Sequence, residues 1–160
     1  MPVTMPVTMP EPNRGATVPV GTTPLFTMTL RRDADHSVTV RNGPKGNLAI
    51  AAVAEGGTFE GERLRGTLVA GTSGDWATLR PDGSFLVDAR LTLLTDDNVP
   101  IFMTYRGVGA FDGDGKAWMQ TAPLFETGEG PYDWLNMVQA VAFGQHDGVD
   151  LVYDVHTLDR

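Results

Sequence analysis

The feature that most restricts how this chain can fold is an alternation of apolar and polar residues with a period of two, which begins at Pro24. Successive side chains of a β-strand point to opposite faces, so this period indicates strands that each bury one face. Turn residues interrupt the alternation at intervals of roughly 8–12 residues, which is typical of antiparallel sandwiches and barrels. The predicted strands cover residues 25–32, 37–41, 47–54, 63–70, 76–80, 84–94, 100–108, 117–126, 136–143 and 149–158.

The connections between the predicted strands have the chemistry of tight turns. Asp82-Gly83 and Asp147-Gly148 are the strongest hairpin signals, because both residue types tolerate tight backbone angles. No segment has a sustained helical period, and residues 132–137 predict one or two turns at most before a terminal hairpin. Because closure removes the exposed edges of a sheet, we expect an all-β fold, a single antiparallel β-barrel of about 8–10 strands with little helix, in preference to a sandwich.

The chain has the length of one domain, preceded by an unusual N-terminal segment. Residues 1–23 contain the unit Met-Pro-Val-Thr twice and are rich in Pro and Thr, so we expect a flexible tail there and the barrel domain over residues 24–160. Proline recurs every four positions in the tail, which interrupts the apolar run of a signal peptide. No stretch approaches the roughly 20 apolar residues of a membrane span. We therefore expect a cytoplasmic protein.

Charge and composition limit the partners and the chemistry. The 12 Lys and Arg residues against 20 Asp and Glu give a net charge of −8, which repels nucleic acid and anionic membranes alike. The absence of Cys excludes disulfides, thiolate nucleophiles and Cys-based metal sites. His36, His146 and His156 are far apart, and their spacing matches no dedicated metal site. We therefore expect no metal, no cofactor, no nucleic acid and no membrane partner.

One predicted strand, residues 84–92, carries an acid and a base on the same face. Its other face is apolar and consists of Phe85, Val87, Ala89 and Leu91. If the mixed face lines a cavity, Asp88 can take a proton while Arg90 orients a substrate carbonyl. If that face meets solvent, the two residues form a surface ion pair worth about 0–1 kcal/mol. Both interpretations stay open at the level of sequence.

Other candidate residues lie near predicted turns and strand ends. Asp75 and Trp76 follow the turn at residues 71–74, where an Asp is a turn cap or an acid at the barrel rim, and a Trp is a plug or a stacking surface. Tyr105 either packs or serves as a general acid or hydrogen-bond donor to an enolate. The remaining candidates, which are typical either of a ligand-pocket wall or of a plug in a barrel end, are Phe125, Thr127, Trp134 and Asn136.

The order of several short motifs along the chain resembles the DUF3237 family, over about Pro24 to the C-terminus. These motifs are Gly57-Thr58-Phe59-Glu60-Gly61, Arg63-Leu64-Arg65-Gly66, Gly74-Asp75-Trp76, Arg80-Pro81-Asp82-Gly83, Asp88-Ala89-Arg90, Thr95-Asp96-Asp97, Tyr105-Arg106-Gly107, Phe125-Glu126-Thr127 and Tyr132-Asp133-Trp134-Leu135-Asn136. The resemblance implies a calycin-like or allene-oxide-cyclase-like antiparallel barrel with a central cavity. Asn98 stands where the family usually has Gly, and Asn also accepts left-handed backbone angles.

The resemblance also implies a chemistry, because some relatives are associated with cofactor-free ring closure such as addition of a hydroxyl to a double bond. We therefore expect a cofactor-independent cyclase, isomerase or lyase for a small hydrophobic, natural-product-like molecule. In that reading Asp75 or Asp88 accepts a proton, and Arg90 and Tyr105 stabilise an oxyanion. Trp76, Phe125 and Trp134 form the walls of the site, and Thr127 and Asn136 position the substrate. The alternatives are a non-catalytic binding or carrier barrel and a structural homo-oligomer.

Overall fold

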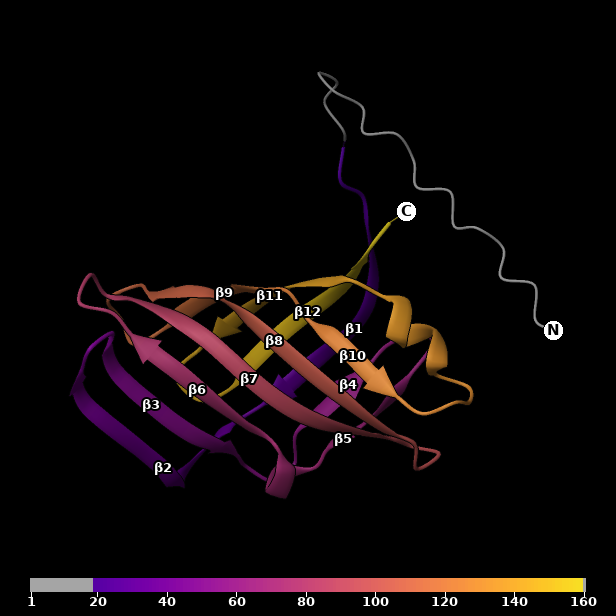
Figure 1. Ribbon diagram of the computed structural model, residues 1–160, viewed down its shortest axis with the longest axis horizontal. Coiled ribbons are helices and arrows are strands. Elements are labelled where there is room, and N and C mark those ends of the chain that lie inside the picture. The colour runs from indigo at the N-terminus through magenta and orange to yellow at the C-terminus, as the bar shows by residue number, and fades with distance from the viewer. Residues whose placement is uncertain (1–18, 160) are drawn as a thin grey trace.

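The computed structural model describes residues 19–159, which form one antiparallel sheet of twelve strands and two short 3-10 turns, η1 (Ala70–Thr72) and η2 (Asp133–Met137) (Figure 1). The strands are β1 (Thr22–Leu30), β2 (Arg32–Gly43), β3 (Gly46–Val53), β4 (Thr58–Glu60), β5 (Arg65–Leu68), β6 (Gly74–Leu79), β7 (Ser84–Thr95), β8 (Pro100–Phe111), β9 (Ala117–Thr121), β10 (Leu124–Thr127), β11 (Ala140–His146) and β12 (Leu151–Leu158).

The sheet closes on itself because β7 pairs with β8. Strands β8, β9, β11, β12, β1, β4, β5 and β7 are paired in that order, and the β7–β8 ladder joins the two ends into a ring. β10 branches from β8, and β6, β3 and β2 branch from β7. The branch returns to the ring where the Ala54 N–H donates to the Arg31 carbonyl at 2.8 Å, between the end of β3 and the β1–β2 junction. The predicted all-β antiparallel barrel is confirmed.

The strand count exceeds the predicted ten for two local reasons. The predicted strand at residues 117–126 is divided at Ala122-Pro123 into β9 and β10, because proline has no N–H to continue a ladder. β4 was not predicted, since three residues are too few to show a period. The predicted start of the strand at 136–143 is also wrong, because η2 ends at Met137 and β11 begins at Ala140.

The predicted turns are confirmed by their backbone angles. Gly83 and Gly148 have φ values of +84° and +103°, in the hairpins between β6 and β7 and between β11 and β12. Asn98 has φ +63°, so it adopts the left-handed conformation expected where the family usually has Gly. The predicted tail at residues 1–23 falls mostly on residues 1–18, which lie outside the described residues, and its last two residues belong to β1.

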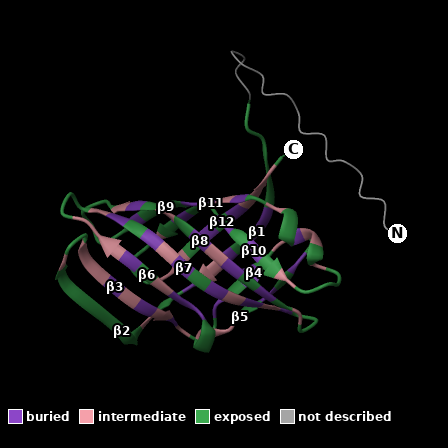
Figure 2. Ribbon diagram, viewed as in Figure 1, coloured by how far each residue is buried: buried purple, intermediate pink, exposed green. Residues whose placement is uncertain are grey.

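The core fills the interior of the barrel with apolar side chains. The alternation of buried and exposed residues along each strand gives the striped pattern of Figure 2, and on β7 it buries Phe85, Val87, Ala89, Leu91 and Leu93. The Phe26 ring packs edge-on against the rings of Phe59 and Phe125, with centroids 5.5 and 6.1 Å apart. Such edge-to-face pairs add to the stability gained by burial. Little of the interior is therefore left open for a ligand.

One strand differs from this pattern. β2 is an edge strand that is exposed along most of its length on both faces, so it projects beyond the barrel wall. Within residues 19–159, the chain has no helix with the length and apolarity needed to span a bilayer.

Candidate functional site

The structure distributes the candidate residues over three places. Asp75 and Tyr105 lie inside the barrel. Trp76, Asp88 and Arg90 lie on its outer face. Phe125, Thr127, Trp134 and Asn136 lie at the end of the barrel that η2 covers.

Asp75 is the acid of the interior. Its strand partners place it in a row across the inner wall, Ala51–Asp75–Ala89–Tyr105, in which the two alanines leave room for the larger side chains. Its Oδ1 atom accepts the Asp88 N–H at 3.3 Å, at a point where the β6–β7 ladder is interrupted. Burial raises the pKa of the Asp75 carboxyl, and this effect is opposed by the Asp88 N–H and by the charge of Arg32.

Two tyrosines lie near this acid, Tyr105 in the same row on β8 and Tyr153 on β12, farther round the ring. Tyr105 and Tyr153 are 4% and 2% exposed, and their ring centroids are 5.4 Å apart. Burial raises the pKa of both phenols, and the negative charge of Asp75 raises them further. Both phenols therefore stay protonated at neutral pH and can donate hydrogen bonds. Tyr153 was missed in the sequence, although its alternation with Val155 in residues 151–158 indicated a buried position.

A cavity adjoins this cluster at the end of the barrel away from η2. Its volume is about 80 Å³, and its lining includes Asp75, Tyr153, Arg32, His146 and Phe111. This is room for about three water molecules, and it is far below the roughly 300–1,000 Å³ of ordinary small-molecule sites. The cavity therefore has room for no more than a small molecular fragment. Arg32 and His146 were also missed as site residues, because they lie far apart in the sequence and meet only across the barrel mouth.

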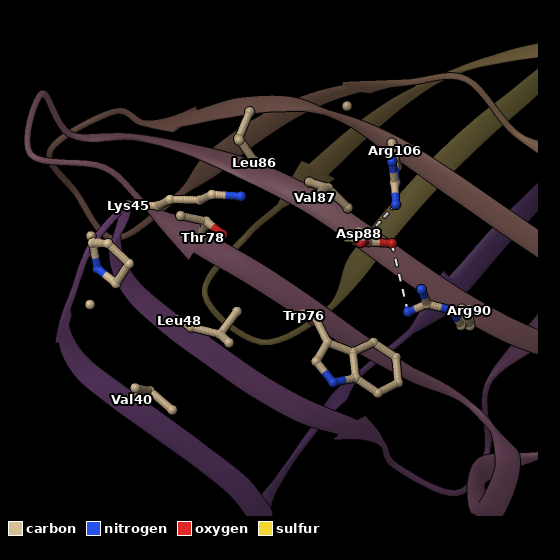
Figure 3. A pocket seen from close by; sticks show the side chains of 14 residues that line it. Val40, Lys45, Leu48, Trp76, Thr78, Leu86, Val87, Asp88, Arg90 and Arg106 are labelled. Carbon is tan, nitrogen blue, oxygen red and sulfur yellow. Dashed lines mark ion pairs between the residues drawn. The ribbon is translucent and has the colours of Figure 1, made fainter.

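Asp88 and Arg90 do not face the interior. The apolar face of β7 is the inner one, so the mixed face lines an outer groove with Trp76 (Figure 3). Asp88 is 3.7 Å from the Arg90 guanidinium and 3.5 Å from that of Arg106. The Arg90 guanidinium lies 5.0 Å from the centroid of the Trp76 ring. If the mixed face of β7 pointed inward, the apolar side chains that now fill the core would be exposed to solvent. The hydrophobic effect excludes that orientation.

The residues at the η2 end are held by contacts within the chain. Phe125 is buried in the aromatic core. Asn136 accepts the Thr127 N–H at 2.9 Å and donates to the Thr127 carbonyl at 3.0 Å, which fixes η2 to β10. The Arg63 guanidinium covers Trp134, 3.6 Å from its ring centroid. Together with Leu135, which is fully buried, these contacts are those of a plug that closes this end of the barrel.

Within the described part of the chain, no group of three or more His, Asp or Glu side chains is arranged to hold a metal ion.

The fold and the interior cluster define the class of the molecule. It is a small antiparallel β-barrel protein with an acid and two phenols on the inner face of the barrel.

Solved structures share this fold. A β-barrel-like protein from Acinetobacter baumannii is 24% identical, with 91% of this chain and all of that chain covered and a TM-score of 0.79. A protein of unknown function from Rhodopseudomonas palustris is 24% identical, with 89% and 100% covered and a TM-score of 0.80. An enzyme from Penicillium herquei is 22% identical, with 90% and 98% covered and a TM-score of 0.68. These likenesses show the fold.

The family follows from the sequence itself. The model of DUF3237, described as a protein of unknown function, matches residues 20–158. The chain belongs to the DUF3237 family, as its motifs predicted. No curated protein matches the chain.

Proposed function

We propose that this protein is a cofactor-independent cyclase or isomerase that acts on a small hydrophobic organic molecule at the cavity beside Asp75. The observation that carries the proposal is a carboxyl group whose pKa is raised by burial, near two protonated phenols inside an apolar barrel. Asp75 and Tyr153 line the same cavity, and an acid beside a hydrogen-bond donor is a usual arrangement for proton-transfer catalysis. The enzyme from Penicillium herquei supports it as a protein of this fold that is described as an enzyme.

The proposed reaction is the addition of a hydroxyl group to a conjugated double bond of the same molecule. The ionised Asp75 removes the hydroxyl proton as the oxygen attacks the β-carbon, and the π electrons move to the carbonyl oxygen. The Tyr153 phenol, which lines the cavity, would stabilise the resulting enolate by hydrogen bonding, and Tyr105, which lies behind the lining with its ring against that of Tyr153, would hold Tyr153 in place. Protonation of the α-carbon by Asp75 completes the isomerisation, so no atom is gained or lost and no external oxidant is needed.

The size of the cavity decides how such a substrate binds. A volume of about 80 Å³ admits the reacting end alone, so the apolar remainder would pack at the mouth against Phe111 and Leu151. Apart from Asp75, Tyr153, Arg32 and His146, the lining of the cavity is apolar, which strengthens each electrostatic interaction with the reacting atoms. The raised pKa places Asp75 nearer to the working pH, where an acid–base group is most effective. Phe125, Thr127, Trp134 and Asn136 serve the site in this proposal by keeping the far end of the barrel closed.

The test uses ortho-hydroxyaryl enones, with 2′-hydroxychalcone as the first probe, because ring closure removes its near-ultraviolet absorbance. Wild type is compared with Asp75→Asn and Tyr153→Phe, and loss of either group is expected to lower kcat by about 10²-fold or more. The matched controls are Asp154→Asn, an exposed acid on the outside of β12, and Tyr132→Phe, whose hydroxyl bonds Asp97 at the other end of the barrel. Both controls should retain the wild-type rate.

Binding measurements separate the alternatives. An enzyme keeps its affinity for the probe in Asp75→Asn while it loses turnover. Ring closure at the wild-type rate in Asp75→Asn would contradict the role of the interior acid. Binding of a panel of such enones without turnover in any variant would identify the protein as a carrier barrel instead.

A further inference from the structure

The outer groove is separate from the interior cavity and much larger. It lies on the outside of β2, β3, β6, β7 and β8, with a volume of about 780 Å³ (Figure 3). This volume falls within the roughly 300–1,000 Å³ of small-molecule sites. The strands β6 and β7 separate it from Asp75, so a ligand in the groove does not touch the interior cluster.

The groove carries positive charge on a protein whose net charge is negative. Lys45, Arg90 and Arg106 line it, and the acid among its lining residues is Asp88. The whole chain has a net charge of −8. The groove therefore concentrates cations at one place on an otherwise acidic molecule, which favours an anionic ligand there.

The cationic side chains of the groove have N–H donors that no hydrogen bond within the described residues uses. Asp88 is shared between two guanidinium groups at 3.5 and 3.7 Å, which is longer than the roughly 2.7–2.9 Å of a charge-assisted hydrogen bond. Within residues 19–159, the side chains of Arg90 and Arg106 form no hydrogen bond, and Lys45 forms no ion pair. Figure 3 shows the Asp88 carboxylate between the two arginines, with the Lys45 side chain extending into the groove beside Thr78 and Leu86. A second carboxylate could bind these groups without displacing any existing hydrogen bond.

The floor of the groove is apolar and partly aromatic. Trp76 and Leu86 are 36% and 37% exposed, and Val40 and Leu48 continue the apolar surface onto the projecting hairpin of β2 and β3. The indole presents its ring to the groove beside Arg90. An apolar floor of this kind supplies affinity through burial of ligand surface, while the cations fix the orientation.

We propose that the outer groove is a binding site for an amphipathic organic anion, a molecule with a flat apolar body and one carboxylate. The body lies on Trp76 and Leu86, and the carboxylate lies between Arg90, Arg106 and Lys45. This proposal does not depend on the proposed reaction at Asp75, because the ligand would bind in the groove whether or not that reaction occurs.

The test is isothermal titration calorimetry of the full chain with 2-naphthoate, and with 2-naphthamide as its neutral isostere. Naphthoate is expected to bind at least about fivefold more tightly than the amide, with an affinity that falls as salt is added. Arg90→Gln and Arg106→Gln should each weaken naphthoate binding by about fivefold, as for loss of one partly exposed charged contact. Arg63→Gln, which removes an arginine over Trp134 at the barrel end, is the matched control and should leave the affinity unchanged.

The Asp88→Asn variant should change the affinity for naphthoate in the opposite direction. Removal of the negative charge between the arginines should strengthen naphthoate binding by about two- to fivefold, whereas a catalytic or purely structural acid would give no such gain. Equal binding of naphthoate and naphthamide, or no change in either arginine variant with native circular dichroism, overturns the proposal. So does weaker binding in Asp75→Asn, which would place the probe in the interior. Sedimentation velocity adds one more contrary outcome, a dimer that dissociates as naphthoate binds, which would make the groove a contact between two copies.

Discussion

Replacement of Asp75 by Asn removes a buried charge while it keeps the shape of the side chain. The amide oxygen of Asn can still accept the Asp88 N–H that Oδ1 accepts now. What disappears is the ionised carboxylate, whose burial raises its pKa. We therefore expect Asp75→Asn to be more stable than the wild type at neutral pH, because the wild type folds at the cost of a desolvated charge.

The sign and the size of this stability difference follow from the difference in the Asp75 pKa between the folded and the unfolded chain. Below the ordinary Asp pKa of about 3.9, the carboxyl is protonated in both folded and unfolded states and imposes no penalty. As the pH rises toward the raised pKa of the folded state, the unfolded chain releases its proton first, so the wild type loses stability. Above the folded pKa the loss is constant, at about 1.4 kcal/mol for each unit by which the pKa is raised. The Asn variant has no such loss.

The assay is urea unfolding of both proteins at a series of pH values from the ordinary Asp pKa to neutrality. The difference in the free energy of unfolding should grow with pH and then level off at the pKa of Asp75, which carboxyl NMR measures directly. Asp154→Asn, at an exposed site, provides the control and should show no comparable dependence. A difference that is flat with pH, or an Asn variant less stable than the wild type at neutral pH, would refute the reasoning.

Other predictions concern the plug, the interior and the close approach of strands. Leu135→Ala removes a fully buried side chain of η2 and should cost about 3–5 kcal/mol in urea unfolding, against less than about 1.5 kcal/mol for the half-exposed Leu124→Ala; equal losses would contradict the plug. Thr121→Val should raise the free energy of unfolding by about 1 kcal/mol, since the Thr121 hydroxyl is buried without a partner among the described residues, and a loss would show that it is bonded. Gly144→Ala places a Cβ against the Tyr153 ring, so it should cost about 1–3 kcal/mol and shift the Tyr153 ring signals in NMR; an unchanged spectrum would contradict this contact.

Much of the fold could be predicted because local patterns and tertiary structure agree. The alternation on β7 is unambiguous, since an unbroken set of apolar residues occupies one face, and that face is the one buried. The turns at Gly83 and Gly148 were predictable because their residue types determine the backbone angle. The β7–β8 ladder is a hairpin between neighbouring strands, whereas β1 pairs with β12 from the other end of the chain, and the strand pattern indicated such closure only through the need to cover edges.

The site was harder to predict because β6 is short and its two faces are mixed. Apolarity alone would place Trp76 inside and Asp75 outside, and the structure has the reverse. The phase of the strand is set by Ala77 and Leu79, which follow Asp75 on the inner face, while Trp76 is accommodated outside beside Arg90. The partners of Asp75 also come from distant strands, and neither Tyr153 nor Arg32 is near it in sequence. Positions of this kind depend on barrel closure, which a period of two does not encode.

The two candidate sites communicate electrostatically through the wall, which yields a last prediction. The Asp88 backbone N–H lowers the pKa of Asp75, while the Asp88 side-chain charge raises it from the outer face. Asp88→Asn removes the charge and keeps the N–H, so the pKa of Asp75 should fall in carboxyl NMR titrations. The fall should be modest, because Asp88 is partly exposed and its charge is shared with two arginines. An unchanged pKa of Asp75 would contradict this coupling and would show that solvent screens Asp75 from the charge of Asp88.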